Sequence, residues 1–248
     1  MILEGILKVY NFLSHFFSDD NIAHILLGIY INSPNLIFPK SKWAEDIIAL
    51  FVSPSIDKQQ FSCIFIDVVN YWEQDYNEFY HRGHYAANYN DYGIIVHELG
   101  HTLAFLLLMI SNPIHATSFN RNLKTVGDCK KINSEITFLD TNFSNYDPKT
   151  TYEYIFTEIL YRKIVNITST ASSLAISSVK RRLALFTALP SKYGWKYNEL
   201  LSTSNYFEGE YFAEAFSYWL LTPINQRNYY WELINDSFQE AFQKAKGL

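Results

Sequence analysis

Residues 96–101 read Val-His-Glu-Leu-Gly-His and carry the strongest chemical signal in the sequence. Two histidines four positions apart lie on one face of an α-helix, so both imidazoles can bind the same tetrahedral Zn²⁺. Glu98 then lies beside the metal, where its carboxylate can take a proton from the zinc-bound water and return it to a leaving amine. We therefore predict His97 and His101 as metal ligands and Glu98 as the catalytic base, the arrangement of a zinc peptidase.

The sequence around this motif is typical of a buried helix. Asp91 is suited to cap its N-terminus, residues 94–110 are largely apolar outside the motif, and Asn112-Pro113 ends it. Polar groups inside such a helix need hydrogen-bonding partners or a metal, because burying them without either is costly. Gly100 leaves bare backbone beside the histidines, and we expect another element to pack closely against it.

A catalytic zinc site needs three protein ligands and one open position, so a third ligand must come from another segment. A third histidine six residues after the motif is excluded, because that position is Leu107. Glu210 and Glu214 are four apart in an otherwise apolar stretch, so their carboxylates share one face of a predicted helix. One of them can bind zinc while the other accepts the distal N–H of a ligating histidine. The further candidates, in order of preference, are Glu158, then Glu208 and His115.

Taken together, the His-Glu-Leu-Gly-His motif at 97–101 and the segment Glu-Tyr-Phe-Ala-Glu-Ala-Phe at 210–216 resemble the catalytic domain of anthrax toxin lethal factor. Its bacterial relatives include the Pro-Pro endopeptidases. The resemblance extends over about residues 61–248 and includes the aromatic segment 229–236. It implies a zinc endopeptidase in which Glu210 is the third ligand and the carboxylate of Glu214 orients a ligand histidine.

The same family places a tyrosine upstream of the ligand glutamate, where its hydroxyl stabilises the oxyanion of the tetrahedral intermediate. The nearest counterpart here is Tyr206, which is closer to Glu210 than the family spacing; that spacing falls on Thr203. The alternative is that Tyr206, one of 19 tyrosines, only packs. The resemblance thus adds Tyr206 to Glu98 as a candidate catalytic residue.

For the fold, the pattern of elements predicts an α+β class that is predominantly helical. The resemblance implies a zincin-like metallopeptidase fold with a small sheet packed on the motif helix. Beside the motif helix, apolar spacing and end signals predict helices over residues 2–17, 21–31, 42–52, 152–165, 178–189, 208–221 and 228–246. Residues 61–69, rich in β-branched and aromatic side chains, form the best strand. That strand is either an edge strand that binds the substrate backbone or an ordinary core strand.

We expect one domain over residues 1–248, with 1–60 as a helical N-terminal subdomain and 61–248 as the catalytic core. The polar segment 111–149 is predicted as a loop at the rim of the cleft, and 76–90 as another loop that shapes specificity. These loops would determine the substrate, which the motifs alone leave open.

Bulk composition limits the classes of partner. The chain has 48% hydrophobic and 18% charged residues, which is typical of globular proteins. A net charge of -5 argues against nucleic-acid binding. The longest apolar run of the motif helix, residues 103–110, is too short for integral membrane insertion. We therefore expect a soluble enzyme with a peptide or protein substrate, and the oligomeric state stays open.

The cellular location also stays open. Residues 1–4, Met-Ile-Leu-Glu, are acidic where a conventional signal peptide is basic, so the alternatives are an intracellular protein and a toxin or effector exported by another route. Cys63 and Cys129 are too few for a disulfide framework, and whether they pair is undecided.

Two other functions remain alternatives to an active peptidase. The chain could be a catalytically inactive zincin-fold module that binds partners in a toxin or phage system, although Glu98 has no chemical purpose in such a module. The motif could also be accidental in a metal-free protein.

Overall fold

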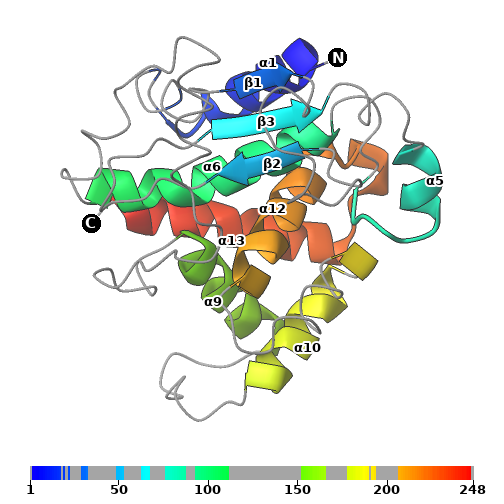
Figure 1. Ribbon diagram of the computed structural model, residues 1–248. Helices are drawn as coiled ribbons and strands as arrows, with labels where there is room; N and C mark the ends of the chain where they lie inside the picture. The colour runs from blue at the N-terminus through cyan, green and yellow to red at the C-terminus, as the bar shows by residue number, and fades with distance from the viewer. Residues whose placement is uncertain are drawn as a thin grey trace.

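In the computed structural model of the chain, the described residues are 2–17, 19, 22, 29–32, 49–52, 63–67, 76–87, 93–111, 152–165, 178–189, 191–193 and 206–246. The elements are, in chain order, α1 (Ile2–Leu13), β1 (Ile29–Asn32), β2 (Ala49–Val52), β3 (Cys63–Asp67), α5 (Tyr76–His81), α6 (Gly93–Ser111), α9 (Tyr152–Val165), α10 (Ser178–Ala188), α12 (Tyr206–Leu221), the 3₁₀ helix η3 (Ile224–Gln226) and α13 (Tyr229–Lys246). Figure 1 shows the strands along one side of α6 and the helices α12, α13 and α9 on the other.

The helix that carries the histidine motif, α6, is the central element. It packs most closely on α12, and also on α1, α9 and β2. Its apolar side chains at Ile95, Val96, Leu99 and Leu103 are fully buried. A helix that is apolar around most of its circumference must be covered on several sides, which explains why so many elements converge on α6.

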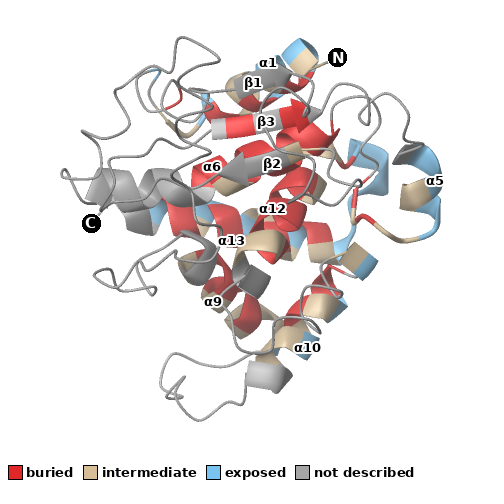
Figure 2. Cartoon of the chain, in the orientation of Figure 1, coloured by how far each residue is buried: buried red, intermediate tan, exposed pale blue. Residues whose placement is uncertain are grey.

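A second packing centre lies where α9, α12 and α13 meet. Buried residues recur every three or four positions along α13, so that one face of the helix turns inward: Trp231, Ile234, Phe238, Ala241 and Phe242. The ring of Phe238 stacks on Phe156 of α9 at a centroid distance of 4.0 Å and on Trp219 of α12 at 4.5 Å. Figure 2 shows that buried residues gather where these helices and α6 face one another. Close aromatic packing thus joins α12 to its neighbours.

The three strands form a small sheet in the order β1-β3-β2. β1 is parallel to β3 and β2 is antiparallel to it, so that Phe65 of β3 pairs with Tyr30 on one side and Leu50 on the other. β3, which lies within the predicted strand 61–69, is therefore the central strand. The edge-strand interpretation of this segment is wrong, because both of its backbone edges are already paired.

The predicted fold class, an α+β zincin-like fold with a small sheet packed on the motif helix, is corrected to a mainly helical fold. Helix-to-helix packing forms the core, and the strands contribute only four, four and five residues. The sheet is not what defines the fold class, because buried apolar residues at helical spacing dominate the described chain.

Individual elements were predicted with mixed success. The helices at α1, α6, α9, α10, α12 and α13 are confirmed, with α6 ending at Ser111 before the predicted stop. The predicted helices 21–31 and 42–52 are wrong at their ends, where β1 and β2 lie. A short apolar run fits the helical period as well as the strand period, so its sequence does not distinguish the two. Backbone pairing with β3 makes these segments strands. α5 lies in a segment predicted as a loop.

The helices and strands do not test the remaining predictions, which concern the rim loop, the helix cap and the division into domains. The predicted rim loop 111–149 and the cap residue Asp91 lie outside the described residues, apart from Ser111. The single domain with a 1–60 subdomain stays a prediction, although β1 and β2 come from residues 1–60 and pair with β3. None of the helices in the described part of the chain combines the length and the apolar character that a membrane span requires.

Replacing Phe238 by Ala tests the aromatic packing centre. Phe238 is fully buried between Phe156 and Trp219. We expect Phe238→Ala to lower the free energy of unfolding by about 3–5 kcal/mol, because it removes apolar contacts and leaves a cavity. Urea titration followed by circular dichroism measures the change. Ile224→Ala, at a side chain that is 81% exposed, is the control and should change it by less than about 0.5 kcal/mol. Equal effects in both variants would contradict this account of the core.

Candidate metal centre

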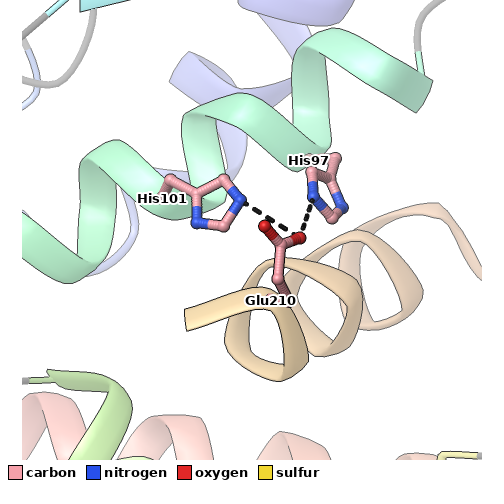
Figure 3. Close-up of side chains that lie close together, drawn as sticks. All are labelled: His97, His101 and Glu210. Atoms are coloured by element: carbon pink, nitrogen blue, oxygen red, sulfur yellow. Dashed lines mark hydrogen bonds and ion pairs between the residues drawn. The ribbon is translucent and has the colours of Figure 1, made fainter. Parts of the chain in front are cut away.

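Three side chains from two helices converge at the motif. His97 and His101 lie one turn apart on α6, and Glu210 faces them from α12 (Figure 3). Oε2 of Glu210 is 3.3 Å from Nε2 of His97 and 3.6 Å from Nε2 of His101. Each of the three offers a ligand atom, and these atoms all lie within 4.8 Å of one another. The structure therefore brings together two imidazole nitrogens and one carboxylate oxygen that could hold a metal ion.

Gly100 explains how α12 comes so near to the histidines. A Cβ at this position would lie 3.0 Å from Cα of Ala213 and 3.2 Å from Cδ1 of Phe216. The first neighbour is backbone and cannot move aside by changing its rotamer. The prediction that another element packs closely against Gly100 is confirmed, and that element is the helix that carries Glu210.

The carboxyl group of Glu210 is held ionised by its surroundings. Burial disfavours the charge, but the attraction and hydrogen bonding of His101 and His97 outweigh it and hold the pKa of Glu210 well below its usual range. Its side chain is 17% exposed, against 15% for His101 and 6% for His97. At neutral pH the group is therefore a carboxylate with an oxygen directed at both imidazoles.

Glu214 occupies the next turn of α12 and contacts the other nitrogen of His97. Its Oε1 is 3.3 Å from Nδ1 of His97, and its Oε2 accepts a hydrogen bond from the backbone N–H of Ala86 at 2.9 Å. Burial raises the pKa of this carboxyl to about 8, and the Ala86 N–H opposes the shift. In its ionised form Glu214 can accept the Nδ1–H of His97, and it is then placed to fix the ring orientation and the tautomer of His97.

Whether the contacts of His97 are favourable depends on which of its two ring nitrogens carries the proton. When Nδ1 carries the proton, it donates to Glu214, and the lone pair of Nε2 faces Oε2 of Glu210 at 3.3 Å. Two acceptors at this distance repel each other unless a proton or a cation lies between them. The donor set therefore fits a metal ion at this position.

The other predicted site residues lie as follows. Glu98 follows His97 on α6 and is 8% exposed. Tyr206 begins α12, one turn before Glu210, and its side chain lies outside the described atoms. Neither arrangement tests the catalytic role that the sequence assigns to these two residues.

Among the other candidate ligands, Glu158 is engaged elsewhere, in ion pairs with Arg162 at 2.9 Å and Arg181 at 3.8 Å. The side chain of Glu208 and the whole of His115 are outside the described part. Of the acids considered as third ligand, Glu210 is therefore the one that the described structure brings to the two histidines.

Sequence reasoning missed a further neighbour of the cluster. The ring of Tyr193 contacts that of His97, with 5.8 Å between centroids and an interplanar angle of 81°. No spacing rule relates Tyr193 to the motif, and nothing in the sequence distinguishes it among 19 tyrosines. The contact of Ala86 with Glu214 could not be predicted from the sequence either, because its donor is a backbone N–H and not a side chain.

Comparisons with protein-family models, with curated proteins and with solved structures find no match for this chain. Its function is therefore argued from the cluster of His97, His101 and Glu210 and from the chemistry of the residues around it.

Gly100→Ala tests whether the close approach of α6 and α12 holds the cluster together. Within a helix this substitution ordinarily stabilises by roughly 0.5–1 kcal/mol, because alanine loses less conformational entropy. Here we expect a loss of about 1–3 kcal/mol in unfolding free energy, since the new Cβ meets the backbone of α12. Binding of added Zn²⁺ should weaken as well, because Glu210 moves away from the histidines. Urea unfolding and chelator competition measure the two effects, and a stabilised variant would refute the steric argument.

Proposed function

We propose that the chain is a zinc-dependent endopeptidase. The observation that carries the proposal is the convergence of His97, His101 and Glu210 within 4.8 Å of one another, with Glu98 adjacent on the same helix. Two imidazoles and one carboxylate make up the donor set of a class of hydrolytic zinc sites, which keep a fourth position for water or substrate. The resemblance of the two motifs to the lethal factor family points to the same chemistry.

Each residue of the cluster has a defined task in this proposal. His97, His101 and Glu210 would hold Zn²⁺, which supplies Lewis acidity and lowers the pKa of a coordinated water toward about 7. Glu98 accepts the proton of the attacking water and transfers it to the nitrogen of the leaving amine. Glu214 keeps His97 in the tautomer that presents Nε2 to the cluster.

Stabilisation of the oxyanion is assigned to Tyr206, which precedes Glu210 by one turn of α12. The substrate is a peptide or protein. We further propose, from the resemblance alone, that the enzyme acts as a toxin-type or effector peptidase. A metal-binding module without turnover is the alternative, and the experiment on Glu98 separates the two.

Glu98→Gln tests the mechanism while keeping the shape of the site. The amide cannot accept the proton of water, so we expect peptide cleavage to fall by about 10²–10⁴-fold with the zinc content unchanged. Metal analysis of the purified protein and mass spectrometry of a peptide library incubated with each form give the two readouts. Full cleavage by the variant would exclude this role of Glu98. A wild-type protein that holds one zinc and cleaves no peptide would instead favour the binding module.

Glu210→Gln and Glu158→Gln form a matched pair that tests the identity of the third ligand. Both carboxylates are partly buried on helices, at 17% and 15% side-chain exposure, but only Glu210 faces the histidines. Zn²⁺ affinity measured by competition with a coloured chelator should fall more than about 100-fold in Glu210→Gln and stay unchanged in Glu158→Gln. Glu214→Gln, which changes only the orientation of His97, should lower it by about 10–100-fold. An equal loss in Glu158→Gln would show that the ligand set is wrong.

A further inference from the structure

Two short segments, residues 82–87 and 191–193, are joined into one unit beside the cluster, which we call the clamp. Four hydrogen bonds between described residues join them. The N–H groups of Lys192 and Tyr193 donate to the carbonyls of Gly83 and His84 at 3.0 and 2.9 Å, the Ser191 hydroxyl donates to the His84 carbonyl at 3.1 Å, and the Lys192 ammonium donates to the Arg82 carbonyl at 2.5 Å. The turn between α5 and residue 84 contains Gly83 at φ 69°, a conformation that other L-residues rarely adopt. The clamp therefore has a defined backbone geometry.

The clamp contacts His97 directly through Tyr193 and indirectly through Glu214. On one side the Tyr193 ring lies nearly perpendicular to the imidazole, at a centroid distance of 5.8 Å. On the other, the N–H of Ala86 holds Oε2 of Glu214 at 2.9 Å, and Oε1 of the same carboxylate contacts Nδ1 of His97 at 3.3 Å. A single unit thus constrains both the plane of the imidazole and the nitrogen that is directed away from the cluster.

The ring of Tyr193 is itself held in place within the clamp. It contacts His84 and Tyr85, each at 5.7 Å between ring centroids, and Tyr85 is buried. The contact with His84 is edge-to-face and the contact with Tyr85 is tilted, and both are off-parallel arrangements that aromatic pairs prefer. The Tyr193 ring is therefore held by His84 and Tyr85 within the clamp and also contacts the imidazole of His97.

We propose that Tyr193 is a positioning residue of the metal centre: its ring, braced by the clamp, holds the His97 imidazole in its metal-binding orientation. The inference rests on the proposed metal site and adds to it a contact outside the two motifs. Metal affinity depends on how far the ligands are oriented before binding, so loss of an orienting contact weakens it by about 10–100-fold. The role belongs to the ring, since the contact with His97 is between rings.

The experiment compares four substitutions in the full chain. Tyr193→Phe keeps the ring and removes the hydroxyl, whereas Tyr193→Leu and Tyr193→Met remove the ring and fill its space. Tyr230→Leu is the matched control, because Tyr230 is a half-buried tyrosine on α13 whose ring contacts Tyr229. Zn²⁺ affinity is measured by chelator competition, and the absorption spectrum of the Co²⁺-loaded protein reports the ligand geometry. Thermal unfolding of the metal-free proteins identifies any variant with a general loss of stability.

We expect Zn²⁺ affinity to fall by about 10–100-fold in Tyr193→Leu and Tyr193→Met, with an altered Co²⁺ spectrum. Tyr193→Phe and Tyr230→Leu should match the wild type in both measurements. Unchanged affinity and spectrum in a folded Leu or Met variant would overturn the inference, as would a loss in Tyr193→Phe as large as in Tyr193→Leu. If the wild-type protein binds no Zn²⁺, the proposed function fails and the positioning role fails with it, a result distinct from the first two.

Discussion

The contact between the backbones of α6 and α12 at Gly100 is the constraint on which the rest of the site depends. The missing side chain lets Ala213 and Phe216 approach the turn of α6 that carries the histidines. Glu210 and Glu214 flank Ala213 on the same helix, so their distance from His97 is set by this approach. Stacked aromatic rings fix α12 from its other side, through Trp219 against Phe238 of α13. The close packing of α12 on α6 at Gly100 thus determines the geometry of the cluster, and rigid elements position its ligands better than loops would.

Placing ionisable groups in so apolar a region requires that each has a partner. Glu210 and Glu214 are identical residues one turn apart, yet their surroundings shift them in opposite directions. Two imidazoles hold the pKa of Glu210 well below its usual range, whereas burial raises that of Glu214 to about 8. The difference arises because Glu210 contacts both histidines, while the charge of Glu214 is disfavoured mainly by burial. Their different surroundings therefore give the two side chains separate roles. Glu210 offers an oxygen to the cluster, and Glu214 contacts Nδ1 of His97.

The sequence could predict those parts of the site that depend on helical period. Residues four apart share a face, which placed His97 with His101 and Glu210 with Glu214, and the missing Cβ of Gly100 indicated a close neighbour. It could not predict contacts between distant segments that no period relates, such as Tyr193 with His97 or Ala86 with Glu214. The same limit affected the fold. The apolar spacing at the ends of 21–31 and 42–52 predicts helix, and the pairing that makes these ends β1 and β2 depends on a partner strand elsewhere in the chain.

The three side chains of the cluster differ in exposure, and in the proposed peptidase this difference indicates the side from which a substrate would reach them. His97 is the most enclosed of the three, since Glu214 contacts Nδ1, the Tyr193 ring is in edge contact with the imidazole, and only 6% of the side chain is exposed. His101 and Glu210 are 15% and 17% exposed, so solvent enters from their side. The proposed catalytic centre would need both conditions at once: one wall that fixes ligand orientation and one face that admits water and substrate. The close helix packing and the clamp supply the wall, and the open face lies along His101 and Glu210.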